Sequence, residues 1–178
     1  MIIGHLPSGY ILSKLLVRYT SGQRQNITFF IAAGVLGGIT PDFDMLYFYL
    51  VDNRQHHHHT YWPHWPIIWF CLLALTAIWY CVVDNKTNAL RGLVFAAGGI
   101  LHLLLDSIVG DIWWLAPIVD QPYALFTVPA IYDPWWLNFI LHWSFALEVM
   151  VVLWAVLLFW RGKSSQKKSN NPDKSCEG

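Results

Sequence analysis

The chain has 178 residues and a formal net charge of zero, and 12% of its residues are charged. That fraction is about half the ~25% found in ordinary soluble domains. The hydrophobic fraction is 56%, and 16% of the residues are Phe, Trp or Tyr. This composition is typical of a protein whose solvent is largely hydrocarbon, with aromatic rings at the membrane interfaces. The zero net charge gives no strongly basic field that would favour a nucleic-acid partner.

The first apolar segment covers residues 6–19 and contains two basic residues four positions apart, Lys14 and Arg18. Two structures are compatible with this pattern. The segment is either an amphipathic helix lying on the membrane surface or a short pass whose basic end reaches the interface.

Four further segments span or nearly span a bilayer, which needs about 20 apolar residues. They are residues 27–51, 67–83, 89–109 and 135–160. Pro41 interrupts the first of them, because proline lacks a backbone donor and breaks a helix. Such a break is tolerated at membrane depth where the backbone is buried in protein or lines a wet cavity. The sequence therefore predicts an all-α, polytopic transmembrane helical bundle over residues 1–160. Residues 161–178 are predicted to form a disordered basic tail.

Basic residues are distributed unequally among the connections between these segments. Arg54 is the basic residue of the loops at 52–65 and 110–134. All the others precede the first span, lie between the second and third, or follow the last: Lys14, Arg18, Arg24, Lys86, Arg91, Arg161, Lys163, Lys167, Lys168 and Lys174. The positive-inside rule then predicts a cytoplasmic tail and external loops at 52–65 and 110–134.

Ionisable residues within membrane spans cost about 2.5–3.5 kcal/mol each on insertion scales and are therefore functional candidates. In the predicted orientation, three pairs of ionisable residues lie toward the external ends of their segments: Asp42 and Asp44, His102 and Asp106, and His142 and Glu148. A histidine-rich loop, residues 56–64, lies on the same side, and His5 joins them if residues 6–19 form an inward pass. The sequence therefore predicts that these side chains converge at one depth.

The spacing of these residues suits a metal ion. His102 and Asp106 are four residues apart and share one helical face. Gly98 and Gly99 lie one turn earlier and would let another backbone approach closely. A mixed set of imidazoles and carboxylates suits Zn²⁺, with Mn²⁺ or Fe also possible. The predicted ligands of one or two divalent ions are His5, Asp42, Asp44, His59, His64, His102 and Asp106.

Each motif also has a plainer interpretation. The His102–Asp106 pair could simply satisfy a buried polar contact, and the histidine run could be a solvated loop. The Pro-Asp-Phe-Asp sequence could be a capped turn. Glu148 follows His142 by six residues and so lies on a different helical face. It is either a general base or a partner in an interhelical hydrogen bond.

The order of these motifs resembles the YdjM-like family of predicted inner-membrane metal-dependent hydrolases. The matching pieces are His5-Leu-Pro-Ser-Gly-Tyr10, Gly38-Ile-Thr-Pro-Asp-Phe-Asp44, the pair His59 and His64, His102-Leu-Leu-Leu-Asp-Ser107, Gly110-Asp-Ile-Trp-Trp-Leu-Ala-Pro117 and His142-Trp-Ser-Phe-Ala-Leu-Glu148. Together they cover roughly residues 4 to 150. The resemblance implies an inner-membrane helical hydrolase with a metal site built from these histidines and aspartates.

The sequence departs from the family pattern at the histidine pair, which usually reads His-Arg-x-x-Thr-His-Ser. Here Thr60 follows His59 directly, and Trp65 stands in place of the serine after His64. The choice of ligand among residues 56–59 therefore stays open.

The predicted function is hydrolysis of a phosphoester or ester in an amphiphilic, lipid-like substrate by a metal-activated water. Asp44 or Glu148 would act as the general base. The alternatives are a non-catalytic metal-binding or metal-transporting membrane protein, and a scaffold whose buried polar groups only join helices.

Overall fold

A computed structural model describes residues 3–20, 26–134 and 136–169. Over these residues the regular secondary structure is helical, with one isolated antiparallel bridge between Ile112 and Tyr123 in the irregular segment after α5. The α-helices are α1 (His5–Leu16), α2 (Ile27–Ile39), α3 (Asp44–Leu50), α4 (Pro66–Val82), α5 (Thr87–Asp106), α6 (Trp136–Ile140) and α7 (Ser144–Ser169). Short 3₁₀ turns are η1 (Val17–Thr20), η2 (Pro41–Phe43), η3 (His58–Thr60) and η4 (Trp62–His64). The predicted all-α class is confirmed.

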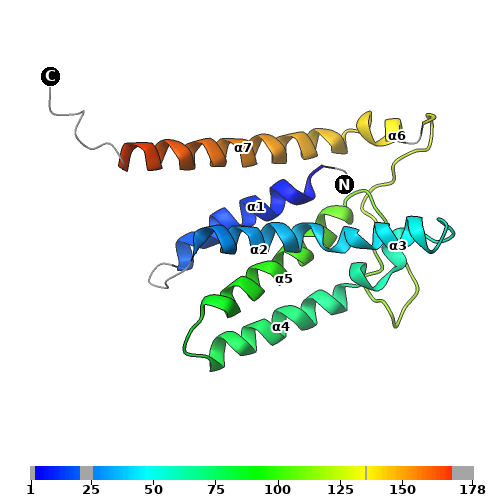
Figure 1. The fold of residues 1–178 in the computed structure, drawn as a ribbon. Helices are drawn as coiled ribbons and strands as arrows, with labels where there is room; N and C mark the ends of the chain where they lie inside the picture. The colour runs from blue at the N-terminus through cyan, green and yellow to red at the C-terminus, as the bar shows by residue number, and fades with distance from the viewer. Residues whose placement is uncertain (1–2, 21–25, 135, 170–178) are drawn as a thin grey trace, which may run out of the picture.

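The bundle is organised around α2 and α5. Helix α2 packs against both α5 and α1, and α4 packs against the other side of α5. Helix α7 lies along α1 at the edge of the bundle (Figure 1). The connections at 51–65 and 107–134 gather at one end of the molecule with α3 and α6, while the α4–α5 turn lies at the opposite end (Figure 1).

The prediction of four clear spans is wrong in number. By length and composition, α5 and residues 144–163 of α7 can each cross a membrane, and α2 together with η2 and α3 makes a third if that bent pair is one span. The bend at Pro41 is 54°, as expected where proline interrupts the helical hydrogen-bond ladder. Helix α4 is apolar but has 17 residues, or about 26 Å of helix against a hydrocarbon core of ~30 Å.

The segment predicted as the last span, 135–160, also begins later than expected. Helix α6 ends at Ile140, and α7 begins at Ser144 after a short turn. At its other end α7 continues to Ser169, inside the predicted tail, and residues 170–178 of that tail lie outside the described part of the chain.

Helix α1 forms most of the N-terminal segment predicted over residues 6–19. It packs against α2, α5 and α7, and it buries residues on several sides, including Gly9, Ile11 and Ser13. Helix α1 is therefore packed into the helical bundle, and its position relative to the membrane stays a prediction.

Glycines allow α2 and α5 to approach closely. Gly37 of α2 faces the Phe95 carbonyl of α5, and a Cβ added at Gly98 of α5 would lie 2.7 Å from the Gly34 carbonyl oxygen of α2. Gly34 and Gly38 face mainly α1. Small residues at such spacing are characteristic of helix pairs in membranes, where packing and hydrogen bonds drive association. The close approach predicted from Gly98 is therefore present in the structure.

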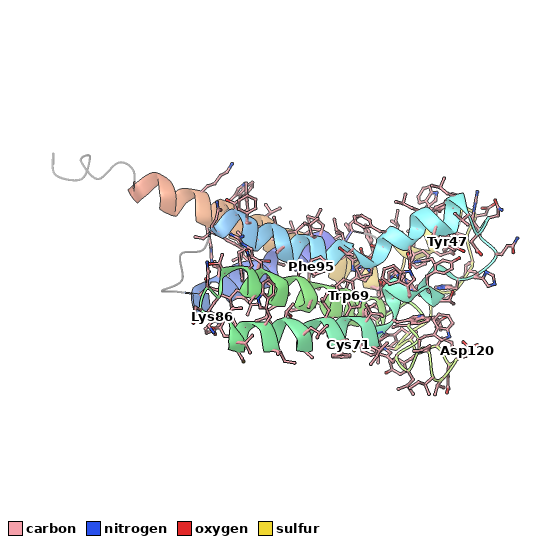
Figure 2. The ribbon with its side chains drawn as sticks, turned by 60° about the horizontal axis from the view of Figure 1, so that its bottom comes forward. Tyr47, Trp69, Cys71, Lys86, Phe95 and Asp120 are labelled. Atoms are coloured by element: carbon pink, nitrogen blue, oxygen red, sulfur yellow. The ribbon has the colours of Figure 1, made fainter. Side chains whose placement is uncertain are left out.

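The loop after α5 covers one end of the bundle (Figure 2). Leu125 N–H donates to the Ser107 carbonyl, and Trp114 Nε1 donates to the Ser107 hydroxyl. Ile112 is fully buried and packs with Trp69 and Leu103 in an apolar cluster. This loop therefore forms a packed cover over the end of the bundle where the histidines lie.

Candidate metal centre

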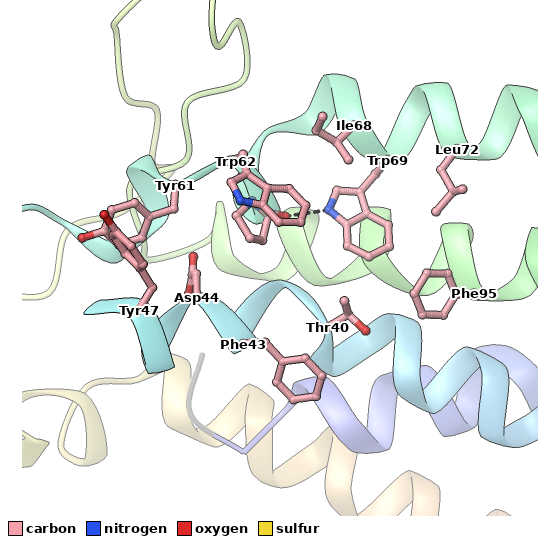
Figure 3. Close-up of a pocket in the computed structure, with 11 residues that line it drawn as sticks. Thr40, Phe43, Asp44, Tyr47, Tyr61, Trp62, Ile68, Trp69, Leu72 and Phe95 are labelled. Atoms are coloured by element: carbon pink, nitrogen blue, oxygen red, sulfur yellow. Dashed lines mark hydrogen bonds between the residues drawn. The ribbon is translucent and has the colours of Figure 1, made fainter. Parts of the chain in front are cut away.

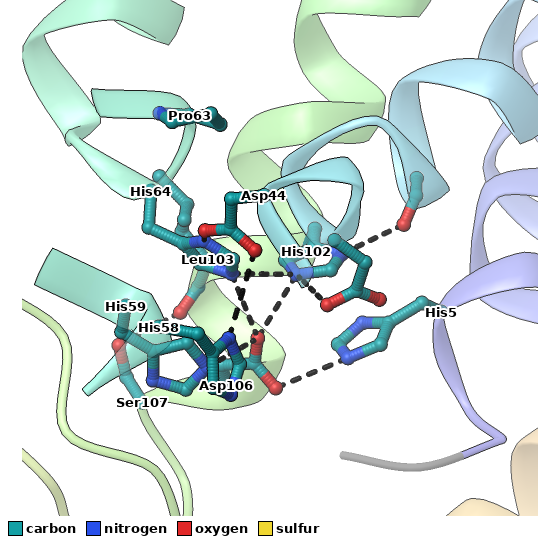
Figure 4. A network of polar contacts seen from close by, with 12 residues as sticks. His5, Asp44, His58, His59, Pro63, His64, His102, Leu103, Asp106 and Ser107 are labelled. Atoms are coloured by element: carbon teal, nitrogen blue, oxygen red, sulfur yellow. Dashed lines mark hydrogen bonds and ion pairs between the residues drawn. The ribbon is translucent and has the colours of Figure 1, made fainter. Parts of the chain in front are cut away.

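Five separate elements bring histidines and carboxylates together at the covered end of the bundle (Figure 4). The side chains fall into two groups, in each of which the possible ligand atoms all lie within 4.8 Å of one another. The first group is His5, Asp42, His102 and Asp106, and the second is His58, His59 and His64. The predicted convergence of α1, the Pro41 break, the histidine loop and α5 is therefore present.

Asp106 connects the two groups. Its Oδ1 lies 3.0 Å from His5 Nε2, and its Oδ2 lies 2.9 Å from His102 Nε2. The same Oδ2 lies 3.7 Å from His59 Nε2 and 3.8 Å from His64 Nε2. The side chain of Asp106 is 1% exposed. One buried carboxylate thus faces four imidazoles.

Three of these imidazoles are oriented by hydrogen bonds at their other nitrogen. His102 Nδ1 donates to the Gly38 carbonyl at 2.7 Å, and His59 Nδ1 donates to the Asp111 carbonyl at 2.9 Å. His64 Nδ1 is paired with Asp44 Oδ2 at 2.5 Å. A metal-binding histidine usually donates its second N–H to a carbonyl or carboxylate in this way, which fixes the tautomer and the ring orientation.

These hydrogen bonds leave lone pairs facing one another. With Nδ1 protonated, a neutral imidazole presents an acceptor at Nε2. His102 Nε2 and His64 Nε2 lie 3.3 Å apart, and both face Asp106 Oδ2. Buried acceptors that face each other are costly unless a cation or a proton lies between them. The donor set therefore fits a bound cation.

The spacing and chemistry of these atoms fit a bound transition-metal ion such as zinc. Two ligands about 2.0–2.1 Å from a tetrahedral zinc lie roughly 3.3 Å apart. The contacts of Asp106 with His5 and His102, and that between His102 and His64, fall between 2.9 and 3.3 Å. Imidazole with carboxylate suits zinc and its neighbours in the first transition row better than calcium or magnesium.

Burial and the neighbouring carboxylates shift the pKa values of His59 and His64. Burial lowers the pKa of His59 well below its usual value, because a charged imidazole loses its water. Burial also lowers the pKa of His64, but its hydrogen bond to Asp44 and the nearby carboxylates of Asp44 and Asp106 outweigh burial and raise its pKa to about 9. A metal ion requires the deprotonated ring and would compete with the proton on His64.

The histidine loop contains three ligand candidates, His58, His59 and His64, and a separate pair formed by His56 and Asp52. The structure places His58 beside His59 and His64, with His58 Nδ1 3.7 Å from Asp44 Oδ1. His56 instead pairs with Asp52 at the surface. Sequence reasoning left the choice within residues 56–59 open, and adjacent histidines carry no signal that separates an inward ring from an outward one.

Asp44 contacts the cluster through histidines. It is buried, and its oxygens face His64 Nδ1 and His58 Nδ1. We expect Asp44→Asn to weaken zinc binding by about 10–100-fold, the usual cost of losing a carboxylate that orients a ligand histidine. A zinc titration against a competing chelator measures this loss. Asp52→Asn, which breaks a His–Asp pair outside both groups, should leave the affinity unchanged.

Glu148 lies in neither group of converging ligand atoms. Its Oε2 accepts hydrogen bonds from the backbone N–H groups of Ile3 (2.6 Å) and Gly4 (3.1 Å), next to the start of α1, and its side chain is buried. The carboxylate thereby joins α7 to α1, which is the second of the two roles left open for it. His142 is likewise outside both groups, and its Nδ1 contacts the Ser144 hydroxyl.

We expect Glu148→Gln to lower the free energy of unfolding by about 1.5–3 kcal/mol, the usual contribution of a hydrogen bond to a charged group. Zinc content should stay at the wild-type value. Thermal unfolding and metal analysis of the same detergent-purified sample measure the two quantities. Loss of zinc without loss of stability would instead place Glu148 in the metal centre.

Three cavities border the cluster. The cavity with the most polar wall of the three, which we call the polar cavity, has a volume of about 600 Å³. It is lined by Asp42, Asp106, Asp111 and the loop histidines 57–59, together with apolar residues such as Met45 and Phe126. An apolar cavity of about 580 Å³ includes His5 and Asp42 in its wall. A second apolar cavity, of about 660 Å³, includes Asp44 (Figure 3). The cluster is therefore reachable from a polar side and borders apolar space on two others.

The family model of the YdjM inner membrane protein matches residues 1–167. The chain belongs to this family. That match agrees with the apolar helices and makes this chain an integral inner-membrane protein. Comparisons with curated proteins and with solved structures gave no match. The YdjM match covers every residue of the two ligand groups, so the metal centre belongs to the shared region of the chain.

Proposed function

We propose that this protein is a membrane-bound metal-dependent hydrolase that cleaves a phosphoester or ester bond of an amphiphilic substrate. The observation that carries the proposal is the buried Asp106 carboxylate, which faces four imidazoles, three of them oriented by Nδ1 hydrogen bonds. Such pre-orientation favours a bound ion over a set of ordinary structural hydrogen bonds.

The proposed ligands are the two converging groups, with Asp106 between them and zinc as the favoured ion in one or two copies. A bound zinc ion would polarise the scissile phosphoryl or carbonyl group and lower the pKa of a water molecule toward ~7. Asp44 holds His64 in its ligand orientation, which fits a positioning role. Asp42 is 39% exposed and lies on the wall of the polar cavity, so its carboxylate is placed to accept a proton from an entering water.

Two features support a catalytic site over a closed storage site. The polar cavity reaches Asp106 and the loop histidines, so the cluster has an accessible side, as catalytic metal sites do. Apolar cavities adjoin the same cluster, which favours a substrate with both polar and apolar parts. We further propose that the tail is cytoplasmic and the metal centre external, as the basic residues indicate.

The test is hydrolysis by the zinc-reconstituted protein in detergent. Nitrophenyl phosphodiesters, phosphomonoesters and carboxylic esters, each with a short and a long alkyl chain, cover the proposed bond types. We expect turnover of at least one class, its loss on chelation and its recovery with zinc. Asp120→Asn is a matched control, because Asp120 is exposed and belongs to neither ligand group. Bound zinc with no turnover in any class would leave a non-catalytic metal-binding protein.

A further inference from the structure

The apolar cavity on the α7 side is a groove between three helices. Leu6 and Tyr10 of α1, Ile39 of α2, and Ala155 and Phe159 of α7 are among the residues that line it. Its wall is apolar or aromatic except at one end, where the imidazole of His5 and the carboxylate of Asp42 lie. A groove of this composition suits a hydrocarbon chain whose polar end is at the metal centre.

Asp42 makes the groove continuous with the polar cavity. It lines both spaces, and it is part of the ligand group that includes His5 and Asp106. A single molecule could therefore place its polar head beside Asp106 and its chain between α1 and α7. That is the arrangement a hydrolase for an amphiphile requires, because the scissile bond lies where head and chain meet.

The groove runs from the metal centre into the bilayer. Along α7 it extends from Val152 to Phe159, which is about 10 Å of helix. Tyr10 and Phe159 line its far end, with ring centroids 6.5 Å apart in an edge-to-face arrangement. Lys163 Nζ then lies over the outer part of that end, 4.6 Å from the Phe159 ring centroid. The chain path therefore stops before the basic end of α7.

The other apolar cavity is a poorer candidate for the same chain. It lies between η2, α3, η4, α4 and α5, and Trp69, Leu72 and Phe95 are among the residues that line it (Figure 3). It shares no lining residue with the polar cavity. Its contact with the cluster is Asp44, whose carboxylate is paired with His64. A molecule in this cavity would contact Asp44, which orients His64, and would not contact Asp106.

Helix α7 allows entry from the lipid. Of its membrane-spanning window, 11% is buried inside the protein, against 39% for α5, so bilayer lipid surrounds most of it. We propose that the groove between α1, α2 and α7 binds the alkyl or acyl chain of the substrate, which enters from the membrane and places its phosphate or ester head beside Asp42. This inference rests on the proposed hydrolase function and names its substrate class as a long-chain lipid.

The test uses hexadecylphosphonate with a diazirine at the end of its chain, because its carbon–phosphorus bond is not an ester and cannot be hydrolysed as one. Photolysis of the zinc-loaded protein in mixed micelles should label peptides of α1 and α7 around Tyr10 and Phe159. Unlabelled hexadecylphosphonate should compete, and methylphosphonate should not. Chelation of zinc should release the head and abolish the labelling.

Two variants provide the matched comparison. Ala155→Trp fills the groove, since Ala155 lines it and is 9% exposed, and should abolish the labelling. Leu153→Trp adds the same side chain two residues away, at a position that is 56% exposed and outside the groove, and should leave it unchanged. Zinc content is measured in every sample. If Ala155→Trp does not accumulate, competition by hexadecylphosphonate but not by methylphosphonate on the wild-type protein still shows whether the groove binds the chain.

The outcomes separate this inference from the function on which it rests. Labelling of α1 and α7 that depends on zinc and on an open groove supports it. Labelling of α4 and α5, or labelling spread over lipid-facing residues without competition, overturns it in a protein that still binds zinc. Absence of bound zinc overturns the hydrolase proposal and this inference with it.

Discussion

Asp106→Asn is expected to remove essentially all bound metal, reducing a wild-type content of one or two zinc ions per chain to background. Asp106 connects both ligand groups, with its two oxygens facing four imidazoles. The amide keeps the shape of the side chain but loses its negative charge, and its NH₂ group cannot coordinate a metal. Loss at this one position should therefore exceed the loss from removing any single histidine.

Metal analysis by mass spectrometry of detergent-purified protein measures this effect. Asp120→Asn is the control, because it makes the same chemical change at an exposed carboxylate. Hydrolytic activity should fall by about 10³-fold or more in Asp106→Asn, since metal catalysis contributes several kcal/mol of transition-state stabilisation. A wild-type chain that holds no zinc after reconstitution would leave the cluster as a set of structural polar contacts.

Helical periodicity was enough to predict part of the centre. His102 and Asp106 are four residues apart, and the helix alone places both side chains on one face, 2.9 Å from each other. Pro41 predicts the break that turns Asp42 toward the cluster, and the structure bends there by 54°. Helical spacing and the proline break are local properties of the sequence, so these parts of the site could be predicted from it.

Long-range contacts decided the rest. Asp44 was predicted as a ligand or base, but its pairing with His64 depends on how η4 folds over α3, which no local pattern encodes. Glu148 binds the backbone N–H groups of Ile3 and Gly4, more than 140 residues away in the chain. His58 faces inward through the course of a loop and not through any periodicity. The three cavities depend on packing between helices and have no signature in the sequence.

The error in the number of spans has a similar origin. Hydropathy identifies apolar segments, but it does not show where a helix starts and stops. Pro66 begins α4, and the helix ends at Val82, so an apolar segment becomes a helix shorter than the ordinary span. The turn between α6 and α7 likewise divides a segment that is continuous in hydropathy. Helix ends, more than composition, determined the count.

Gly98→Leu is expected to separate α2 from α5 and to disrupt the metal centre from one turn away. A Cβ at this position would meet only backbone atoms of α2: Gly34 O at 2.7 Å, Gly38 N at 3.0 Å and Gly37 C at 3.1 Å. Backbone atoms cannot rotate away as a side chain can. The helices must therefore move apart, and the hydrogen bond from His102 Nδ1 to the Gly38 carbonyl should be lost with that movement.

We expect Gly98→Leu to lower the free energy of unfolding, because the cost of overpacking exceeds the gain in helix propensity. Replacing a helical glycine raises intrinsic helix stability by up to about 1 kcal/mol, whereas overpacking costs about 1–3 kcal/mol and sometimes more. A net loss of stability, together with weaker zinc binding, would show that the close crossing positions His102. Thermal unfolding and chelator competition measure both, and Gly98→Ala should give a smaller loss of each.

Gly162→Leu is the matched control. A Cβ there would meet only the Lys14 Nζ, at 3.4 Å, and that flexible side chain can move aside. Zinc affinity should therefore stay at the wild-type value in this variant, and stability should not fall, because replacing a helical glycine adds up to about 1 kcal/mol of helix stability. If Gly98→Leu instead kept full stability and full zinc affinity, α2 and α5 could not be crossing as closely as the structure shows. The orientation of His102 by the Gly38 carbonyl would then have to be abandoned, because that hydrogen bond exists only while the two helices are in contact.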